Sequence, residues 1–397
     1  AILFISHNLA VIARMCDRVG VLYAGRLVEE ARTDEIFAAP RHPYTASLLR
    51  CLPQAGRSKD AAMLATIPGF LPGPGSAPAG CIFAPRCALA DETCRAVEPV
   101  FHRENGRASK CHHPERVPQI QFADVAPIQA SKHSPQTILQ VDGLSKSFGS
   151  GAQRSRVLRD VGFSLNAGET LGLVGESGSG KTTLARCILG LMRPDDGSLL
   201  RFAGKDLGNT TSVRSREQVK SLQIVFQNPD SALNRAHSVR RMLSRTIGVL
   251  VGLRGAAREA RIKNLTSAVR LTDRHLAAVP RQLSGGLKQR VAIARAFASD
   301  PRVLICDEPT SALDVSVQAA ILNLLAELQA TKQVSYILIS HDLGVVRYLS
   351  DRIAVMYLGE ILEIGPAEAV FSGPHHPYTA ALLSSVPTLE GAPSDRT

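Results

Sequence analysis

A glycine-rich stretch followed by a lysine and a threonine is the strongest chemical signal in this sequence. Residues 175–182 read GESGSGKT and match the pattern G-x-x-x-x-G-K-[ST]. Such a loop turns its backbone N–H groups toward phosphate oxygens at the positive end of a helix, although a glycine-rich turn that binds nothing is the alternative. Lys181 can then reach the β- and γ-phosphates of a nucleotide, and the Thr182 hydroxyl can ligate Mg²⁺. The expected phosphate-binding residues are Gly175, Glu176, Ser177, Gly178, Ser179, Gly180, Lys181, Thr182 and Thr183.

Two adjacent carboxylates follow an apolar run farther along the chain. Residues 303–308 read VLICDE, so Asp307 ends a predicted buried strand and Glu308 emerges at the end of that strand. A lone buried carboxylate is costly unless it holds a cation, and Asp307 therefore suits Mg²⁺ coordination. Glu308 can orient an attacking water molecule as a general base. The pattern is weak by itself, but downstream of the glycine-rich loop it indicates nucleotide hydrolysis.

A third segment, residues 283–286 (LSGG), precedes a predicted helix and can form an anion site at the N-terminus of that helix. By itself it is equally well explained as a helix cap. Together with the loop and with residues 303–314 (VLICDEPTSALD), it resembles the ABC-transporter ATPase family, over residues 138–390 fully and residues 1–53 in part. In that family the signature of one subunit closes over the γ-phosphate held by the phosphate loop of the other. The resemblance implies this role for Ser284, Gly285 and Gly286.

The resemblance also implies roles for single residues. Phe148 matches the aromatic residue that stacks on adenine, although it could also be a core aromatic. Gln227 matches the glutamine that senses Mg²⁺ and the membrane partner, and Asp314 matches the loop that contacts the opposing subunit. His341 matches the switch histidine that contacts the γ-phosphate, whereas a lone histidine after a strand is usually structural. With ATP as the nucleotide, the implied catalytic residues are Glu308, His341 and Gln227, and the implied Mg²⁺ ligands are Thr182, Gln227 and Asp307.

Within that family the sequence most resembles the ATPases of oligopeptide and dipeptide importers. The resemblance rests on residues 226–229 (FQNP), 232–234 (ALN) and the repeated HPYT at residues 42–45 and 376–379. It implies membrane permease subunits and a second ATPase module as partners, a solute-binding protein as an indirect partner, and a peripheral location on the cytoplasmic face of the inner membrane. Glutathione, nickel and a peptide-nucleotide antibiotic are other cargoes of such systems. One departure from the family is Leu287, which replaces the usual glutamine of the signature.

The chain also contains an internal repeat. Residues 5–53 align without a gap on residues 339–387, with roughly 20 of about 50 positions identical. His341 lies 334 residues after His7, and this offset is constant along the alignment. We therefore expect the chain to hold the tail of one ATPase module, truncated at its N-terminus, and a whole second copy.

The expected fold is α/β, a P-loop NTPase with a RecA-like parallel sheet, an antiparallel β subdomain and a helical subdomain. Apolar strands that alternate with helical segments indicate a parallel sheet covered on both faces. The alternating patterns of residues 138–147 and 156–166 predict antiparallel strands, and residues 238–279 are mostly helical in composition. The expected domains are residues 1–53 for the remnant of the first module, residues 54–137 for a Pro/Gly-rich, cysteine-bearing tail and linker, and residues 138–397 for the complete module.

Four of the eight cysteines form a group in the middle segment. The group consists of Cys81, Cys87, Cys94 and Cys111. Zinc sites usually contain C-x₂₋₄-C pairs, and this group has none. The wider spacing is compatible with an iron–sulfur cluster, and similar tails in peptide-importer ATPases are associated with a [4Fe–4S] cluster. A cluster, a zinc ion and four reduced thiols in a loop-rich tail are the three alternatives.

The composition is that of a globular protein without membrane spans. Hydrophobic residues make up 45% and charged residues 20%, and no apolar stretch approaches the roughly 18 residues that cross a bilayer. The net charge of +11 is scattered and aromatic residues are only 5%, which favours a solvated basic surface without a nucleic-acid partner. A soluble tandem ABC ATPase acting on ribosomes or nucleic acid is the rival function, but such proteins typically have a long charged helical linker. The Pro/Gly-rich residues 71–80 favour transport instead.

Overall fold

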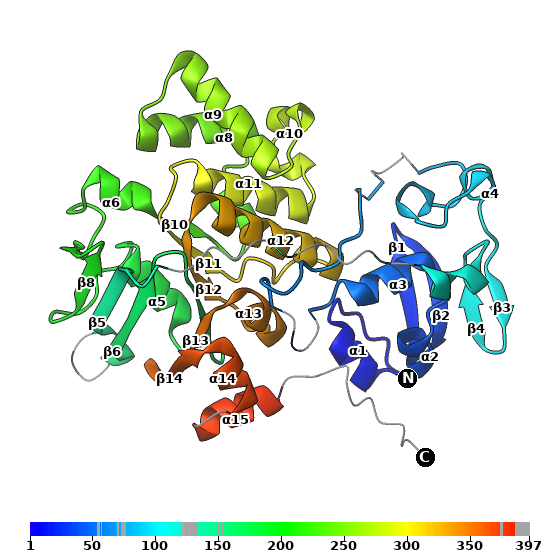
Figure 1. The fold of residues 1–397 in the computed structure, drawn as a ribbon, viewed down its shortest axis with the longest axis horizontal. Helices are drawn as coiled ribbons and strands as arrows, with labels where there is room; N and C mark the ends of the chain where they lie inside the picture. The colour runs from blue at the N-terminus through cyan, green and yellow to red at the C-terminus, as the bar shows by residue number, and fades with distance from the viewer. Residues whose placement is uncertain are drawn as a thin grey trace.

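A computed structural model describes residues 1–385, apart from positions 54, 55, 57, 70, 73–76, 121, 123–126, 128–133, 150, 152, 153, 374 and 375. The predicted extended linker at residues 71–80 lies partly outside the described residues. The N-terminal elements, in blue and cyan, lie to one side of the elements in green to red (Figure 1). Among the described residues, no helix combines the length and the apolarity that crossing a membrane requires.

A six-stranded sheet lies at the centre of the larger part. Its order is β10-β11-β12-β7-β13-β14, and every neighbouring pair is parallel except β13 with β14. The strands are β7 Thr170–Val174, β10 Leu222–Val225, β11 Val303–Asp307, β12 Ser335–Ile339, β13 Arg352–Tyr357 and β14 Glu360–Pro366. Every residue of β7, β11 and β12 is buried, as a parallel sheet covered on both faces requires.

Different helices cover the two faces of this sheet. Leu304 and Cys306 belong to one hydrophobic cluster with helices α11, α12 and α13, whereas Val303 and Ile305 belong to another with helix α5. The covering helices are α5 Lys181–Ile188, α11 Gly285–Phe297, α12 Val315–Lys332 and α13 Leu343–Leu349. Alternate residues of β11 pack in different hydrophobic clusters, because successive side chains of a strand point to opposite faces of the sheet.

An antiparallel sheet packs on the α5 face. Its order is β6-β5-β8-β9, and its strands are β5 Thr137–Phe148, β6 Ser155–Asn166, β8 Leu199–Phe202 and β9 Lys205–Asp206. Leu139, Val141 and Leu165 are buried in the same hydrophobic cluster as residues of α5 and β7. The predicted antiparallel pair is therefore confirmed, and β8 and β9 extend it beyond what the sequence pattern indicated.

The helical subdomain is inserted between β10 and β11, and its helices gather beside α11 (Figure 1). It contains α7 Pro229–Ala232, α8 Val239–Thr246, a π-helical turn Ile247–Val251, α9 Gly255–Ala268 and α10 Asp273–Ala277. The helical prediction for residues 238–279 is confirmed. Helix α6 Arg216–Ser221 leads directly into β10, which ends at Val225.

The sequence repeat is also a structural repeat. The first copy contains α1 Leu9–Met15, β1 Arg18–Tyr23, β2 Arg26–Arg32, α2 Thr33–Ala38 and α3 Pro43–Arg50. Each has the bounds, 334 residues earlier, of α13, β13, β14, α14 Ala367–Ser372 and α15 Pro377–Ser384. The β1–β2 pair even has its register shift after Val21, at the position that corresponds to Val355 in β13. Similar sequences have therefore taken the same local fold twice.

The cysteine-bearing segment completes the sheet of the first copy. Strands β3 His102–Glu104 and β4 Arg107–Ser109 join β1 and β2 in the order β1-β2-β4-β3. Glu29 of β2 pairs with Ser109 of β4, so that β4 covers a strand edge that would otherwise be exposed. The predicted boundary at residue 53 therefore does not separate two independent sheets.

A segment after the first copy, residues 58–67, lies against the larger part. The amide of Leu64 donates to Asn323 Oδ1 at 3.0 Å, and Asn323 Nδ2 donates back to the Leu64 carbonyl at 2.8 Å. Lys59 Nζ lies within hydrogen-bonding distance of Thr170 Oγ1 at 3.3 Å, Gln329 Oε1 at 3.0 Å and Asp351 Oδ2 at 3.0 Å. These buried polar contacts fix one register of the segment on helices α12 and α13.

Candidate functional site

The glycine-rich loop connects strand β7 to helix α5 and is shaped by glycines. Gly175 has φ 147°, and a Cβ there would lie 2.0 Å from the carbonyl oxygen of Met356. Gly180 is the N-cap of α5 with φ 104°, in a region that side chains disfavour. Lys181 Nζ turns back over the loop and donates to the carbonyl oxygens of Gly175 and Glu176, at 2.7 Å each. The loop has the strand–loop–helix context that the phosphate-binding motif requires.

Two of the implied Mg²⁺ ligands lie beside each other. The Thr182 hydroxyl donates to Asp307 Oδ1 at 3.3 Å. Asp307 is buried, and burial raises the pKa of its carboxyl above the ordinary value, with the charge of Glu308 adding to the shift. Burial likewise lowers the pKa of the Lys181 ammonium, while the nearby carboxylates oppose this shift. A bound divalent cation would favour the charged form of Asp307, so the donor set fits Mg²⁺.

The three implied catalytic side chains converge at the ends of β10, β11 and β12. Gln227 Nε2 donates to Glu308 Oε2 at 2.6 Å, and His341 Nδ1 lies 3.3 Å from Glu308 Oε1. Glu308 has φ 48°, which is unusual for a residue with a side chain, and its N–H donates to the Ile339 carbonyl at 2.9 Å. This turn takes Glu308 to the end of the sheet, where its side chain is 19% exposed, while Asp307 stays buried.

The LSGG segment lies at the N-terminus of α11. Ser284 is the N-cap residue, but its side chain makes no capping hydrogen bond and remains exposed, which argues against a purely capping role. A Cβ at Gly286 would lie 2.5 Å from Val317 Cγ1, so this glycine permits close packing on α12. Asp314 is the exposed N-cap of α12. Within the described residues, no hydrogen bond joins residues 284–286 to the phosphate loop.

Phe148 lies at the end of β5 and is 41% exposed, so it is not a core aromatic. Lys146 Nζ lies over its ring, 5.2 Å from the ring centroid. Leu287, the departure from the signature, is partly buried against the larger hydrophobic cluster. The next residue, Lys288, forms an ion pair of 2.8 Å with Asp230 of α7, which ties the start of α11 to the segment after Gln227.

The repeated HPYT motif has a structural basis that the sequence analysis missed. In the second copy His376 is the N-cap of α15, and its Nδ1 accepts the N–H of Tyr378 at 3.1 Å. Glu363 of β14 accepts the N–H of His376 at 3.3 Å and the Thr379 hydroxyl at 2.7 Å. Pro377 occupies the first helical position, where a missing N–H costs nothing. The first copy repeats the two backbone contacts with Glu29, His42 and Tyr44.

The four grouped cysteines line one small cavity. Cys81, Cys87, Cys94 and Cys111 share it with Phe83, His42 and His113 among other residues. Burial raises the pKa of Cys87 to about 11 and of Cys111 to about 12, and the neighbouring thiols add to both shifts. Two sulfurs accept backbone N–H groups, Cys87 from Leu89 at 3.3 Å and Cys111 from His113 at 3.4 Å. Such N–H···S contacts suit thiolates that ligate a metal group, so the donor set fits an iron–sulfur cluster.

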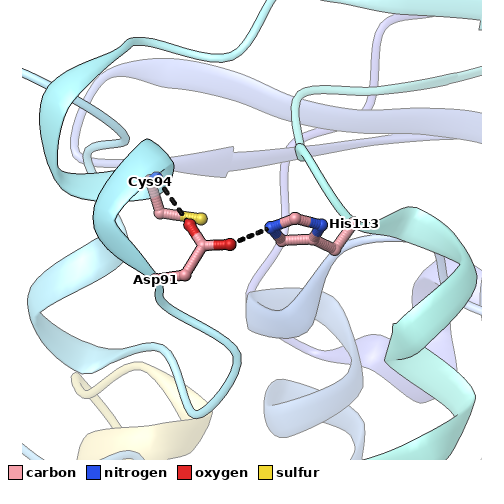
Figure 2. Close-up of side chains that lie close together, drawn as sticks. All are labelled: Asp91, Cys94 and His113. Atoms are coloured by element: carbon pink, nitrogen blue, oxygen red, sulfur yellow. Dashed lines mark hydrogen bonds and ion pairs between the residues drawn. The ribbon is translucent and has the colours of Figure 1, made fainter.

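An aspartate links the segments that carry these cysteines (Figure 2). Asp91 Oδ1 accepts the N–H of Cys94 at 2.9 Å, and its Oδ2 lies 2.7 Å from His113 Nε2. The contact with Cys94 lowers the pKa of Asp91 to about 2. The ligand atoms of Asp91, Cys94 and His113 lie within 4.8 Å of one another, a mixed set that suits zinc. Cysteine spacing alone could not reveal this set, because its oxygen and nitrogen ligands come from other residue types.

Two known families match the sequence. Residues 158–311 match the family described as ABC transporter. Residues 28–94 and 362–396 match the oligopeptide/dipeptide transporter C-terminal region. The two segments of this second match begin 334 residues apart, which is the offset of the internal repeat.

Curated relatives align with nearly the whole chain. The oligopeptide transport ATP-binding protein OppD of Mycobacterium tuberculosis is 36% identical over 405 residues, which cover 98% of this chain and 66% of the relative. The glutathione import ATP-binding protein GsiA is 36% identical in Pectobacterium atrosepticum and 35% identical in Escherichia coli strain K12, covering 98% of this chain and 56% of each relative. The chain therefore spans only about half to two thirds of the length of these relatives.

Solved structures share the fold of the larger part. CbiO1 from Clostridium perfringens, part of the ABC transporter complex cbiONQ, aligns with a TM-score of 0.53 and 28% identity, over 60% of this chain and 92% of that chain. The ATP-binding cassette MJ0796, in a dimeric post-hydrolysis state bound to ADP and Pi, aligns with a TM-score of 0.51 and 27% identity, over 58% and 99%. With the phosphate loop, the LSGG segment and both HPYT helices in place, this chain belongs to the ABC-transporter ATP-binding proteins of the oligopeptide/dipeptide importer type.

Proposed function

We propose that this chain binds and hydrolyses ATP to energise a membrane importer of peptides. The observation that supports it most is the convergence of Gln227 and His341 on Glu308, at the end of the sheet that carries the phosphate loop. The relatives named for oligopeptide transport and glutathione import support the importer class.

Glu308 and the residues around it have different roles in ATP hydrolysis. Glu308 accepts a proton from the water that attacks the γ-phosphorus, and Gln227 orients that water and the carboxylate. His341 contacts the γ-phosphate beside Glu308. Lys181 exchanges its loop carbonyl partners for β- and γ-phosphate oxygens, because its three donors are free to rotate. These roles are supported by the positions of Lys181, Gln227 and His341, each of which has a polar atom within 3.3 Å of a partner in the site.

The proposed Mg²⁺ site combines a residue at the end of the phosphate loop with residues at the ends of neighbouring strands. Thr182 and Asp307, with Gln227, would hold Mg²⁺, which neutralises the charge on the phosphates when it is bound. The burial of Asp307 and its hydrogen bond from the Thr182 hydroxyl keep these two oxygens in place.

The remaining residues face other partners. Phe148 stacks on the adenine, and its exposure leaves a ring face available. The LSGG segment, residues 284–286, closes over the γ-phosphate of a second ATPase module, and Asp314 contacts that module. The chain thereby works with permease subunits at the cytoplasmic face of the cell membrane, as a peripheral protein, with a solute-binding protein as an indirect partner.

Peptides are the proposed cargo, because the HPYT-bearing region matches the oligopeptide/dipeptide transporters in both copies. Glutathione is a second candidate, since the GsiA relatives are about as similar as OppD. Proteoliposomes that contain the whole transporter should take up labelled tripeptides or glutathione only when ATP is present on the side of the membrane that carries the ATPase. ATP hydrolysis that neither permease nor cargo stimulates, with co-purification of ribosomes, would favour the soluble tandem ATPase instead.

A [4Fe–4S] cluster in the cysteine cavity belongs to the same proposal. Four thiols line one cavity, and two of them accept backbone N–H groups. When bound, the cluster would cross-link a segment that otherwise has little regular structure. Gly80 allows the close approach that this needs, because a Cβ there would lie 2.4 Å from the carbonyl oxygen of Cys94.

A further inference from the structure

The C-terminal HPYT motif reaches the phosphate loop through one hydrogen bond. The N–H of Glu176, the second residue of the loop, donates to the Tyr378 hydroxyl at 3.1 Å. The two residues are 202 positions apart in the sequence. The tyrosine of the motif therefore contacts the phosphate loop, whereas the histidine and the threonine bond to Glu363 of β14 at the start of the helix.

Three further contacts hold the Tyr378 hydroxyl in this position. The tyrosine N–H donates to the His376 side chain, which sets the start of α15. Its ring packs on Tyr357, the last residue of β13, with the ring centroids 4.4 Å apart. It also packs, partly buried, against a hydrophobic cluster that includes Val174, the residue before the loop. These contacts fix the position of the Tyr378 ring, and with it the hydroxyl, beside the loop.

The end of strand β13 also contacts the backbone of the phosphate loop. The close approach of Gly175 to the Met356 carbonyl places the loop entry directly against β13. The N–H of Gly359, in the turn after β13, donates to the Ser179 carbonyl at 3.1 Å. The loop is therefore held by backbone contacts at its entry and near its end, and Tyr378 adds a side-chain contact between them at Glu176.

We propose that Tyr378 is a positioning residue for nucleotide binding, which makes the HPYT helix part of the ATP site. By holding the Glu176 N–H, it limits the conformations of the loop, so that fewer are lost when phosphates bind. The inference rests on the proposed function, since it requires that the loop bind ATP.

The first copy provides a matched comparison within the same chain. Tyr44 occupies the corresponding position and packs on Tyr23 with ring centroids 4.7 Å apart. It is covered by Phe83 of the cysteine-bearing segment, with centroids 5.5 Å apart. Removing the Tyr44 hydroxyl should therefore leave the phosphate loop of the second copy unchanged.

The test compares Tyr378→Phe with Tyr44→Phe in the full chain. Phenylalanine keeps the ring contact and removes only the hydroxyl. We expect Tyr378→Phe to speed hydrogen exchange of the Glu176 amide and to weaken Mg·ATP binding by about three- to tenfold, which corresponds to the loss of one hydrogen bond. The melting temperature should stay close to that of wild type, and Tyr44→Phe should alter neither the exchange nor the affinity.

The possible results separate the two proposals. Wild-type affinity and unchanged Glu176 exchange in Tyr378→Phe would overturn the role of the tyrosine while leaving ATP binding intact. If Tyr378→Phe and Tyr44→Phe lost ATP affinity equally, the effect would come from general packing of the HPYT helices. That result would also overturn the role of Tyr378. A wild-type chain that binds no ATP would overturn the proposed function itself, whereas the exchange measurement without nucleotide still reports on the Tyr378 contact.

Discussion

Lys59 Nζ lies 3.0 Å from Asp351 Oδ2, and this ion pair joins residues that are 292 positions apart. Both side chains are largely removed from water, with 7% and 16% of their surface exposed. A lysine is rarely buried to this degree unless it is paired, so the contact places the segment after the first copy in a defined position on the second. The cysteine-bearing region is thereby attached to the helix that follows His341.

Replacing Lys59 should release this segment. Lys59→Met keeps the length of the side chain but leaves the Asp351 carboxylate without its buried cation, and should destabilise the folded chain by about 3 kcal/mol. Thermal or urea unfolding measures the loss, with the exposed Lys205→Met as the control. The double variant with Asp351→Asn should lose less than the sum of the two single variants. A Lys59→Met protein as stable as the control would show that the segment is not held by this pair.

The general-base assignment predicts a separation of binding from hydrolysis. Glu308→Gln should retain ATP binding and lower the steady-state hydrolysis rate by about 10²- to 10⁴-fold, because glutamine cannot accept the proton from water. The exposed Glu217→Gln serves as the charge-matched control. Hydrolysis at the wild-type rate in Glu308→Gln would exclude this residue as the base.

The phosphate-loop lysine should act on affinity instead. Lys181→Ala removes a charge-assisted contact with the phosphates and should weaken ATP binding by about 1.5–3 kcal/mol. Titration calorimetry of the variant beside Lys205→Ala checks this. Undiminished affinity would mean that the loop does not bind the phosphates through Lys181.

The number of nucleotide sites tests the domain assignment. Residues 1–53 contain neither a phosphate loop nor an LSGG segment, so the 397-residue chain should bind one ATP. Calorimetric stoichiometry decides the matter. Two saturable sites per chain would contradict the assignment of residues 1–53 as a remnant.

Metal analysis should identify the occupant of the cysteine cavity. Protein purified without oxygen should be brown and carry about four irons per chain. Cys87→Ser should abolish the colour and the iron but leave ATP binding nearly unchanged, whereas Cys16→Ser, outside the cavity, should alter neither.

A second variant distinguishes iron from zinc in that cavity. Asp91→Ala removes an oxygen of the mixed ligand set but none of the four thiols. It should therefore leave the iron content unchanged if the cysteines hold a cluster. One zinc and no iron in the wild type, lost in Asp91→Ala, would assign the site to the mixed set. If no preparation contains a metal, the four cysteines are reduced thiols.

Local patterns in the sequence were enough to predict the nucleotide-site motifs and most of the sheet. The phosphate loop, the strand that ends at Asp307 and the antiparallel pair are all where their patterns predicted them, because each depends on neighbouring residues. The boundaries of the helices needed the structure: α12 begins at Val315, because Asp314 serves as its N-cap. The short β8 and β9 had too few residues to show a pattern.

By itself the sequence determined the family motifs, the repeat and the residue types of the ATP site. Only the tertiary structure decided that Gln227 and His341 meet at Glu308, that β4 completes the sheet of the first copy, and that Tyr378 holds Glu176. The physical reason is that a helix or a strand is specified by side chains a few positions apart. The partner of a buried lysine or of a loop N–H is instead selected by how the finished layers pack, across 202 residues for Tyr378 and 292 for Lys59.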